Sequence, residues 1–224
     1  LNAINAKTDL VCFNDWVQEL KNYNYLHNHT RMLFASIWIF TLGLPWQKGA
    51  EFFMKHLLDG DAASNTLSWR WVAGIQTKGK NYIAQNWNIR KFSNNKYKDM
   101  ILNENPKPVI DHREYDILPL NIKESDKKLE NLIIFDNETN FKSSRLDKYK
   151  KIYCILLTFE ERKVGLSNKV LEFKKNLIKN QIKESNIDIE FIDGNTFIDI
   201  SNSVKDFDVI YPSVGENMSF LKRI

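Results

Sequence analysis

Residues 1–104 show the spacing of hydrophobic positions that is typical of helices. Apolar side chains recur every three or four residues at Leu10, Phe13, Val17 and Leu20, which predicts a helix over residues 10–20. Further helices are expected over residues 30–42, 46–58, 62–74 and 82–92. The breaks between them carry residues that end, begin or cap helices, namely Gly43, Pro45, Asp59, Gly60 and Asp61. The pattern predicts an all-α domain over residues 1–104.

The pattern changes after residue 104. Residues 105–128 are rich in proline and charge and are expected to be a linker. Short runs of branched and aromatic residues then predict strands over residues 132–135, 152–157, 187–192 and 209–211. Helices are expected between them over residues 168–184 and 197–204. This alternation predicts a small α/β, Rossmann-like domain over residues 129–224, so the fold class expected for the chain is α+β.

Composition and charge narrow the classes of function. Of the 224 residues, 43% are hydrophobic, which favours a packed core over disorder. The net charge of only +4 does not indicate a surface that binds polyanions in general. Any contact with nucleic acid would need a local basic patch. The candidates either contact a DNA backbone or form a solvated face; they are Arg70, Lys78, Lys80, Arg90 and Lys91. The longest uncharged run, residues 32–47, is shorter than the roughly 20 residues that span a bilayer.

The cysteines, the histidines and the first residue each carry a further expectation. Cys12 and Cys154 fit neither a metal spacing nor a disulfide framework, which favours a reducing, cytoplasmic location. No metal is expected, because His27 and His29 have no third ligand at a fitting spacing. The start at Leu1, inside a helical pattern, predicts an N-terminally truncated fragment.

Three clusters of chemistry-bearing residues lie in the helical part, at residues 26–32, 44–46 and 59–71. On the predicted helix 62–74, one face carries Asp61, Asn65, Trp69 and Val72, because they follow at intervals of four, four and three. Trp71 is expected to point to a different surface. An amide offers both donors and an acceptor, an indole can supply an electron, and carboxylates can accept hydrogen bonds from sugar hydroxyls. These groups suit flavin binding with electron transfer.

These clusters resemble the photolyase/cryptochrome family. In that family an L/M-H-N-x-x-R-M segment precedes a tryptophan and a D-G-D-x-A-x-N-x-x-x-W-x-W motif, and the spacing fits from Thr8 to Trp71 without a gap. The resemblance covers the C-terminal half of the family's FAD-binding domain. It implies FAD as cofactor, with the cofactor-binding residues Asn28, Arg31, Asp59, Asp61 and Asn65.

The resemblance also implies the roles of individual residues. Asn65 would lie nearest the redox-active ring nitrogen, and Arg31 would pair with Asp59. Trp69 would be the innermost tryptophan of an electron-transfer chain and Trp46 the next one outward. The substrate side, facing damaged DNA, would be formed by Met32, Trp71 and His29. His29 stands where many photolyases have an arginine that contacts DNA phosphate.

Several functions stay open at this point. Asn65 favours the repair branch of the family, a lyase in which blue light drives an electron from reduced FAD to a pyrimidine dimer. The alternatives are a cryptochrome-like light sensor without repair activity, and a DNA-binding or interaction module without a flavin. The sequence indicates no protein partner. Burial alone is expected to explain Trp16, Trp38 and Trp87.

Overall fold

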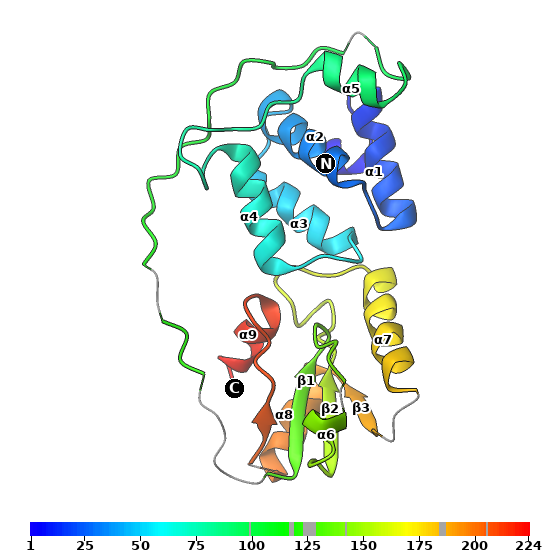
Figure 1. Cartoon of the computed structure of the whole chain (residues 1–224), viewed down its shortest axis with the longest axis vertical. Coiled ribbons are helices and arrows are strands. Elements are labelled where there is room, and N and C mark those ends of the chain that lie inside the picture. Colours follow the sequence, from blue (N-terminus) through cyan, green and yellow to red (C-terminus); the bar gives the residue numbers. More distant parts are fainter. Residues whose placement is uncertain (99, 117–118, 123–128, 142, 184–186, 205) are drawn as a thin grey trace. The chain divides into compact units, whose positions relative to one another are not determined.

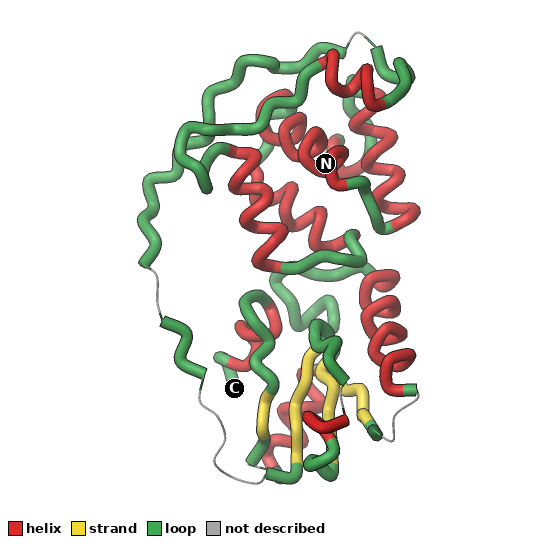
Figure 2. The backbone as a smooth tube through the Cα atoms, viewed as in Figure 1, coloured by secondary structure: helices red, strands yellow, loops and turns green. Residues whose placement is uncertain are grey.

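Helices form the first part of the chain, and a parallel sheet with its own helices forms the second (Figure 1). The computed structural model describes residues 1–98, 100–116, 119–122, 129–141, 143–183, 187–204 and 206–224. The described chain divides into two units, Leu1–Tyr115 and Asp116–Ile224. The expected mixture of helices and a parallel sheet is confirmed. Figure 2 shows the strands confined to the second unit.

The helices of the first unit follow the predicted order. They are η1 (Ala3–Asn5), α1 (Val11–Tyr23), α2 (Asn28–Ser36), the π-helical turn η2 (Ile37–Thr41), α3 (Trp46–His56), α4 (Ala62–Ala73) and α5 (Asn86–Phe92). Asp61 caps α4, because its Oδ1 accepts a hydrogen bond of 2.8 Å from the Ser64 N–H. Gly74 ends α4 with a φ of +79°, in the left-handed region that favours glycine.

The core of the first unit is built around a group of buried aromatic rings. Phe34 stacks on Phe13 with a centroid distance of 4.4 Å, and Trp69 meets Phe34, Trp38 and Phe53 edge-on. Gly49 lets α3 approach this group: a Cβ there would lie 2.2 Å from the Trp69 ring. Burial of each such ring contributes about 1.5–3 kcal/mol, so these contacts fix α3 against α4.

One tryptophan predicted to be buried is not. Trp16 and Trp38 are buried, but Trp87 on α5 is 60% exposed, so the expectation for Trp87 was wrong. Its indole N–H donates to the Gln85 side chain, which also lies near the surface. Helix α5 has only seven residues and turns Ile89, not Trp87, toward the core.

Residues 105–115, which we call the strap, belong to the first unit although the sequence predicts a linker there. The Val109 N–H donates to the Ala73 carbonyl at 2.9 Å, and Asp111 pairs with Arg70 at 3.1 Å. Ala73 is in the last turn of α4, where carbonyls have no partner within the helix. The strap therefore completes the end of α4. Residues 117–118 and 123–128 of the predicted linker lie outside the described residues.

The second unit has a four-stranded parallel sheet in the order β3-β2-β1-β4. The strands are β1 (Asn131–Phe135), β2 (Lys151–Ile155), β3 (Ile189–Ile192) and β4 (Asp208–Val209). The helices are α6 (Ser143–Leu146), α7 (Asn168–Ile182), α8 (Gly194–Ser203) and α9 (Glu216–Leu221). Phe197 of α8 and Phe220 of α9 cover one face, and Leu146 of α6 and Ile178 of α7 cover the other. Both faces are buried, as is usual for parallel sheets.

Candidate functional site

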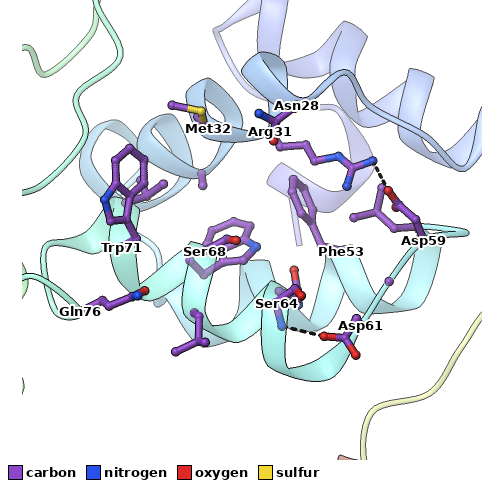
Figure 3. A pocket seen from close by; sticks show the side chains of 17 residues that line it. Asn28, Arg31, Met32, Phe53, Asp59, Asp61, Ser64, Ser68, Trp71 and Gln76 are labelled. Carbon is purple, nitrogen blue, oxygen red and sulfur yellow. Dashed lines mark hydrogen bonds and ion pairs between the residues drawn. The ribbon is translucent and has the colours of Figure 1, made fainter. Parts of the chain in front are cut away.

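A cavity of about 490 Å³ lies in the first unit, lined by α2, the end of α3, the turn after it and α4 (Figure 3). This volume is within the range of small-molecule sites. Most of the residues predicted for the site line it: Asn28, Arg31, Met32, Asp59, Asp61, Asn65, Trp69 and Trp71. The helix face predicted from the four-four-three spacing is therefore turned toward one cavity.

Arg31 fixes the position of Asp59 at the acidic end of the cavity. Its Nη2 lies 3.0 Å from Asp59 Oδ2, so the pairing expected from the resemblance is present, and its Nε donates to the Leu26 carbonyl at 2.8 Å. Figure 3 shows the Arg31 side chain extending from α2 to Asp59. The guanidinium thus joins the start of α2 to the turn before α4. Asp59 stays 58% exposed at its side chain, so a ligand can reach it.

The polar groups of α4 differ in how they are satisfied. The Asn65 Nδ2 donates to the Ala50 carbonyl of α3 at 2.9 Å, which fixes the plane of its amide. Trp69 is 2% exposed, and its Nε1 has no hydrogen-bond partner among the described residues. A buried N–H without a partner costs about 1–3 kcal/mol, so an acceptor on a ligand would stabilise this site. Phe53, Leu57 and Val72 add apolar walls suited to a planar ring.

Trp69 and Trp71 are expected on different surfaces of α4, and both border the cavity. The reason is that the cavity extends along α4 as far as Gln76, so positions on two sides of the helix reach it. Figure 3 shows Trp71 at one end of the cavity and Asp59 at the other. Trp71 is 39% exposed and stacks on Tyr82 with a centroid distance of 5.7 Å.

Two predicted residues do not line the cavity. Trp46 is half-buried at the start of α3, with the Arg70 Cζ 5.9 Å from its ring centroid. His29 has its Nε2 3.3 Å from the Tyr82 hydroxyl and meets the Phe92 ring edge-on at 4.7 Å. Any role of these two side chains would therefore be exerted from outside the cavity.

The prediction missed several polar lining residues, including Ser64, Ser68 and Gln76. The sequence does carry a signal for Ser64 and Ser68. They are four residues apart and Trp71 follows three residues later, so the three share one face of the helix. This stripe runs beside the one that carries Asn65 and Trp69. Gln76 follows the helix end, and the periodicity of α4 gives no signal for it.

The residues that line the cavity all fall within one matched segment of the chain. Residues 15–84 match the family model for the FAD binding domain of DNA photolyase. The match supports FAD as the cofactor of this segment. The buried Trp69 N–H, the amides and the apolar walls fit a flavin, which has a planar apolar ring with polar atoms at its edge.

Curated photolyases are similar over the same part of the chain. The deoxyribodipyrimidine photo-lyase of Buchnera aphidicola subsp. Baizongia pistaciae is 39% identical over 67 residues, 30% of this chain and 14% of the relative. Those of Streptomyces griseus (44% over 61 residues) and Escherichia coli K12 (35% over 67 residues) cover 27% and 30% of this chain, and 13% and 14% of those relatives. The chain thus spans about one seventh of the relatives it matches. No solved structure matches the chain significantly.

Two features are absent from the described residues. Among the residues that the structure describes, no helix is long and apolar enough to cross a membrane. In the same residues, no group of three His, Cys, Asp or Glu side chains could hold a metal ion.

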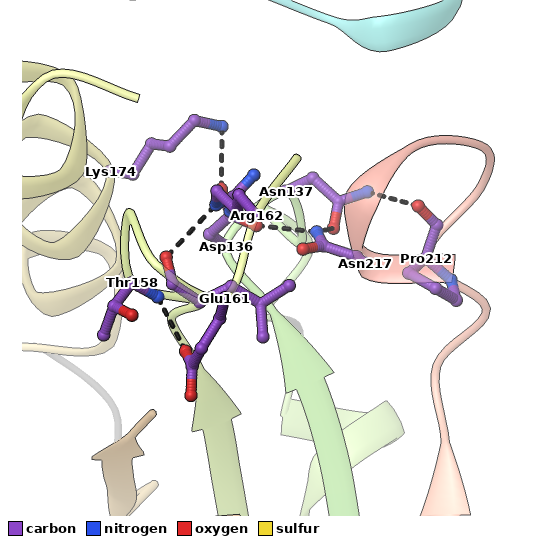
Figure 4. Close-up of polar contacts among 9 residues, drawn as sticks. Asp136, Asn137, Thr158, Glu161, Arg162, Lys174, Pro212 and Asn217 are labelled. Carbon is purple, nitrogen blue, oxygen red and sulfur yellow. Dashed lines mark hydrogen bonds and ion pairs between the residues drawn. The ribbon is translucent and has the colours of Figure 1, made fainter. Parts of the chain in front are cut away.

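The second unit contains a buried charge cluster at the end of β1 (Figure 4). Asp136 directly follows β1 and lies 3.2 Å from Lys174 of α7 and 3.4 Å from Arg162, and it accepts a 2.6 Å hydrogen bond from Asn217 of α9. Burial alone would raise the pKa of Asp136, but the two cations and Asn217 outweigh it and hold the pKa below its ordinary value. The cluster ties the helices of this unit to its sheet.

Proposed function

We propose that the chain is part of a photolyase-like flavoprotein that repairs pyrimidine dimers in damaged DNA under blue light. The observation that carries this proposal is the coincidence of the cavity lining with the segment matched to the photolyase FAD binding domain. When bound, reduced FAD supplies the electron that splits the dimer. The activity would be that of a deoxyribodipyrimidine photo-lyase-like lyase.

In this proposal the polar lining binds and orients the cofactor. Asp59 and Asp61 accept hydrogen bonds from ligand hydroxyls, and Asn28 adds a further polar contact. Asn65 is oriented by its bond to the Ala50 carbonyl, which leaves its carbonyl oxygen as an acceptor for a ring N–H. Arg31 keeps Asp59 in place through the 3.0 Å ion pair.

Trp69 and Trp46 would supply electrons to the cavity. Trp69 lines the cavity and is almost fully buried, which excludes water from its ring. Trp46 would pass electrons inward from a half-buried position. A positive charge on Trp46 would lie beside the Arg70 guanidinium, and the Asp111 carboxylate that pairs with Arg70 offsets this repulsion.

Met32 and Trp71 would receive the lesion. Both line the cavity, and Trp71 is exposed enough for a flipped-out base to stack on it. His29, which is held against Tyr82, would contact a nearby phosphate of the DNA.

The first test is the absorption spectrum of the purified chain with FAD, before and after blue light. We expect a flavin band that bleaches, and bleaches far less in Trp69→Phe. Trp16→Phe is the matched control, because Trp16 is also buried but lies on α1, outside the cavity. Failure of the chain to bind FAD would refute the proposed cofactor site.

The second test is dimer repair in a damaged oligonucleotide. Loss of base stacking on an aromatic side chain costs about 1–3 kcal/mol, so Trp71→Ala should weaken binding of the lesion roughly 5- to 150-fold. Unchanged repair by this variant would contradict the substrate assignment. Photoreduction without repair in the wild-type chain would instead support a cryptochrome-like photoreceptor.

A further inference from the structure

The first unit has a second hollow, of about 560 Å³, around α5 and the turn that follows it. Its lining residues are Asn86, Trp87, Arg90, Lys91, Asn95, Tyr97 and Lys98. Among these described lining residues there are three cations and no carboxylate. None of them lines the cavity of Figure 3, so the hollow is separate from the proposed flavin site.

The hollow lies in a long stretch of the chain that has basic residues and no acidic ones. Residues 62–98 contain seven lysines and arginines and no aspartate or glutamate, while the whole chain has a net charge of only +4. This is the local basic patch that contact with nucleic acid would need. Arg90, Lys91 and Lys98 are all exposed. By contrast, Lys96 is paired with Asp15 at 2.8 Å and does not line the hollow.

The turn after α5 builds the hollow with defined geometry. Asn94 and Asn95 adopt φ values of +51° and +62°, a left-handed conformation that asparagine tolerates better than most residues. The Asn95 side chain accepts a 2.9 Å bond from Arg90 Nε, and its N–H donates to the Arg90 carbonyl at 2.9 Å. The amide orients the Arg90 guanidinium without neutralising its charge.

Trp87 adds an exposed planar surface to these cations. The ring is 60% exposed, and the bond from its N–H to Gln85 restrains its orientation. A positively charged groove with an exposed aromatic ring is typical of sites for single-stranded nucleic acid, because the cations follow the phosphates and a base stacks on the ring. Because the site is concave, it suits a nucleic-acid strand, which can enter the hollow, better than a membrane, whose surface is flat.

We propose that this hollow binds an unpaired stretch of nucleic acid, with one base stacked on Trp87 and phosphates contacted by Arg90, Lys91 and Lys98. The site requires neither a lesion, nor FAD, nor light. It is thus independent of the repair reaction proposed above. It would let the chain hold an unpaired strand away from the flavin cavity.

The test measures binding of the full chain to an undamaged single-stranded oligonucleotide and to the matching duplex, in the dark and without added FAD. Trp87→Ala should weaken single-strand binding roughly 5- to 150-fold, and Trp87→Phe should lose less because it keeps an aromatic face. Tyr23→Ala is the matched control, since Tyr23 is 74% exposed at the end of α1, and it should bind as the wild type does.

The contacts between the cations and the phosphates are measured separately, through the salt dependence of the binding constant. Each phosphate contact contributes about 0.7 to the slope of log K against log salt for single strands, so replacing Arg90, Lys91 and Lys98 by glutamine should reduce the slope by about 2. Replacing the exposed Lys7, Lys48 and Lys55 should leave it unchanged. Tighter binding to the duplex, equal affinities for Trp87→Ala and the wild type, or binding to anionic lipid vesicles in place of the oligonucleotide would each overturn the proposal.

Discussion

Gly49 on α3 is the position at which one added methyl group should disturb the cavity most directly. A Cβ at Gly49 would lie 2.2, 2.4 and 2.9 Å from three carbons of the Trp69 ring. Ordinary van der Waals contact begins near 3.4 Å, so the ring would have to withdraw by about 1.2 Å. Phe34, Trp38 and Phe53 surround the ring edge-on, and the nearest centroid is 5.1 Å away. The ring therefore cannot withdraw without moving the aromatic core.

Overpacking of this kind costs about 1–3 kcal/mol, and the large, almost fully buried ring places Gly49→Ala toward the upper end. One kcal/mol changes the melting temperature of a domain of about 100 residues by roughly 4–8 °C. We expect the first unit of Gly49→Ala to melt roughly 10–20 °C below the wild type. FAD binding should weaken as well, because the displaced ring lines the cavity.

The assay is thermal unfolding of four proteins: the wild type, Gly49→Ala, Trp69→Phe and the double variant. Phenylalanine lacks the part of the indole that would collide, so the added methyl group should be tolerated in the Trp69→Phe background. There it should even stabilise, by up to about 1 kcal/mol, because alanine favours a helix over glycine. An equal loss from Gly49→Ala in both backgrounds would refute the argument that this contact sets the spacing of α3 and α4.

Two further predictions concern the second unit and the thiols. Asp136→Asn should destabilise the second unit by about 3–5 kcal/mol, because it leaves Arg162 and Lys174, 5% and 14% exposed at their side chains, without their carboxylate. Glu190→Gln removes the exposed ion pair between Glu190 of β3 and Lys151 of β2, and should cost under about 1 kcal/mol. Folding lowers the pKa of Asp136, so its contribution to the free energy of unfolding is fully present above the unfolded pKa near 3.9. That contribution is lost as the pH falls through the lower, folded pKa. Urea unfolding at falling pH should therefore show a shrinking difference in stability between the wild type and Asp136→Asn. Burial raises the pKa of both Cys12 and Cys154 to about 12, so a thiol reagent at neutral pH should label neither until the chain unfolds, and rapid labelling of the native chain would contradict their burial.

Local sequence signals located most of the helices because each signal acts over a few residues. Periodicity and end signals placed α1 to α4 to within a few residues, and Asp61 caps α4 as expected. Helix α5 is shorter than predicted because residues before it are held in extended form by distant groups. The Tyr82 N–H donates to the Val72 carbonyl, and the Ala84 N–H donates to Ser36 Oγ at 2.7 Å. No local pattern reports such bonds.

The second unit shows the same limit. Its strands were located by their branched and aromatic runs, but α6 and α9 were not predicted. They have four and six residues, too few for a full helical repeat to appear in the sequence. The charge cluster around Asp136 also escaped prediction, since its members come from four separate segments that only the fold brings together.

The candidate site was predictable where its residues share one helix face. Asp61, Asn65 and Trp69 line one cavity, as their spacing indicates. The position of Trp71 depended on how far the cavity extends, and the exposure of Trp87 depended on which face of a short helix meets the core. Both are properties of the assembled unit.

The strap has a consequence for the order in which the first unit can form during synthesis. The bonds from Val109 to the end of α4 and from Asp111 to Arg70 join residues about 40 positions apart in the chain. A ribosome that has released the chain only as far as residue 104 would hold a chain whose α4 lacks these partners. Helix α4, with the cavity it borders, therefore reaches its final stability only after the proline-rich residues beyond position 104 have emerged.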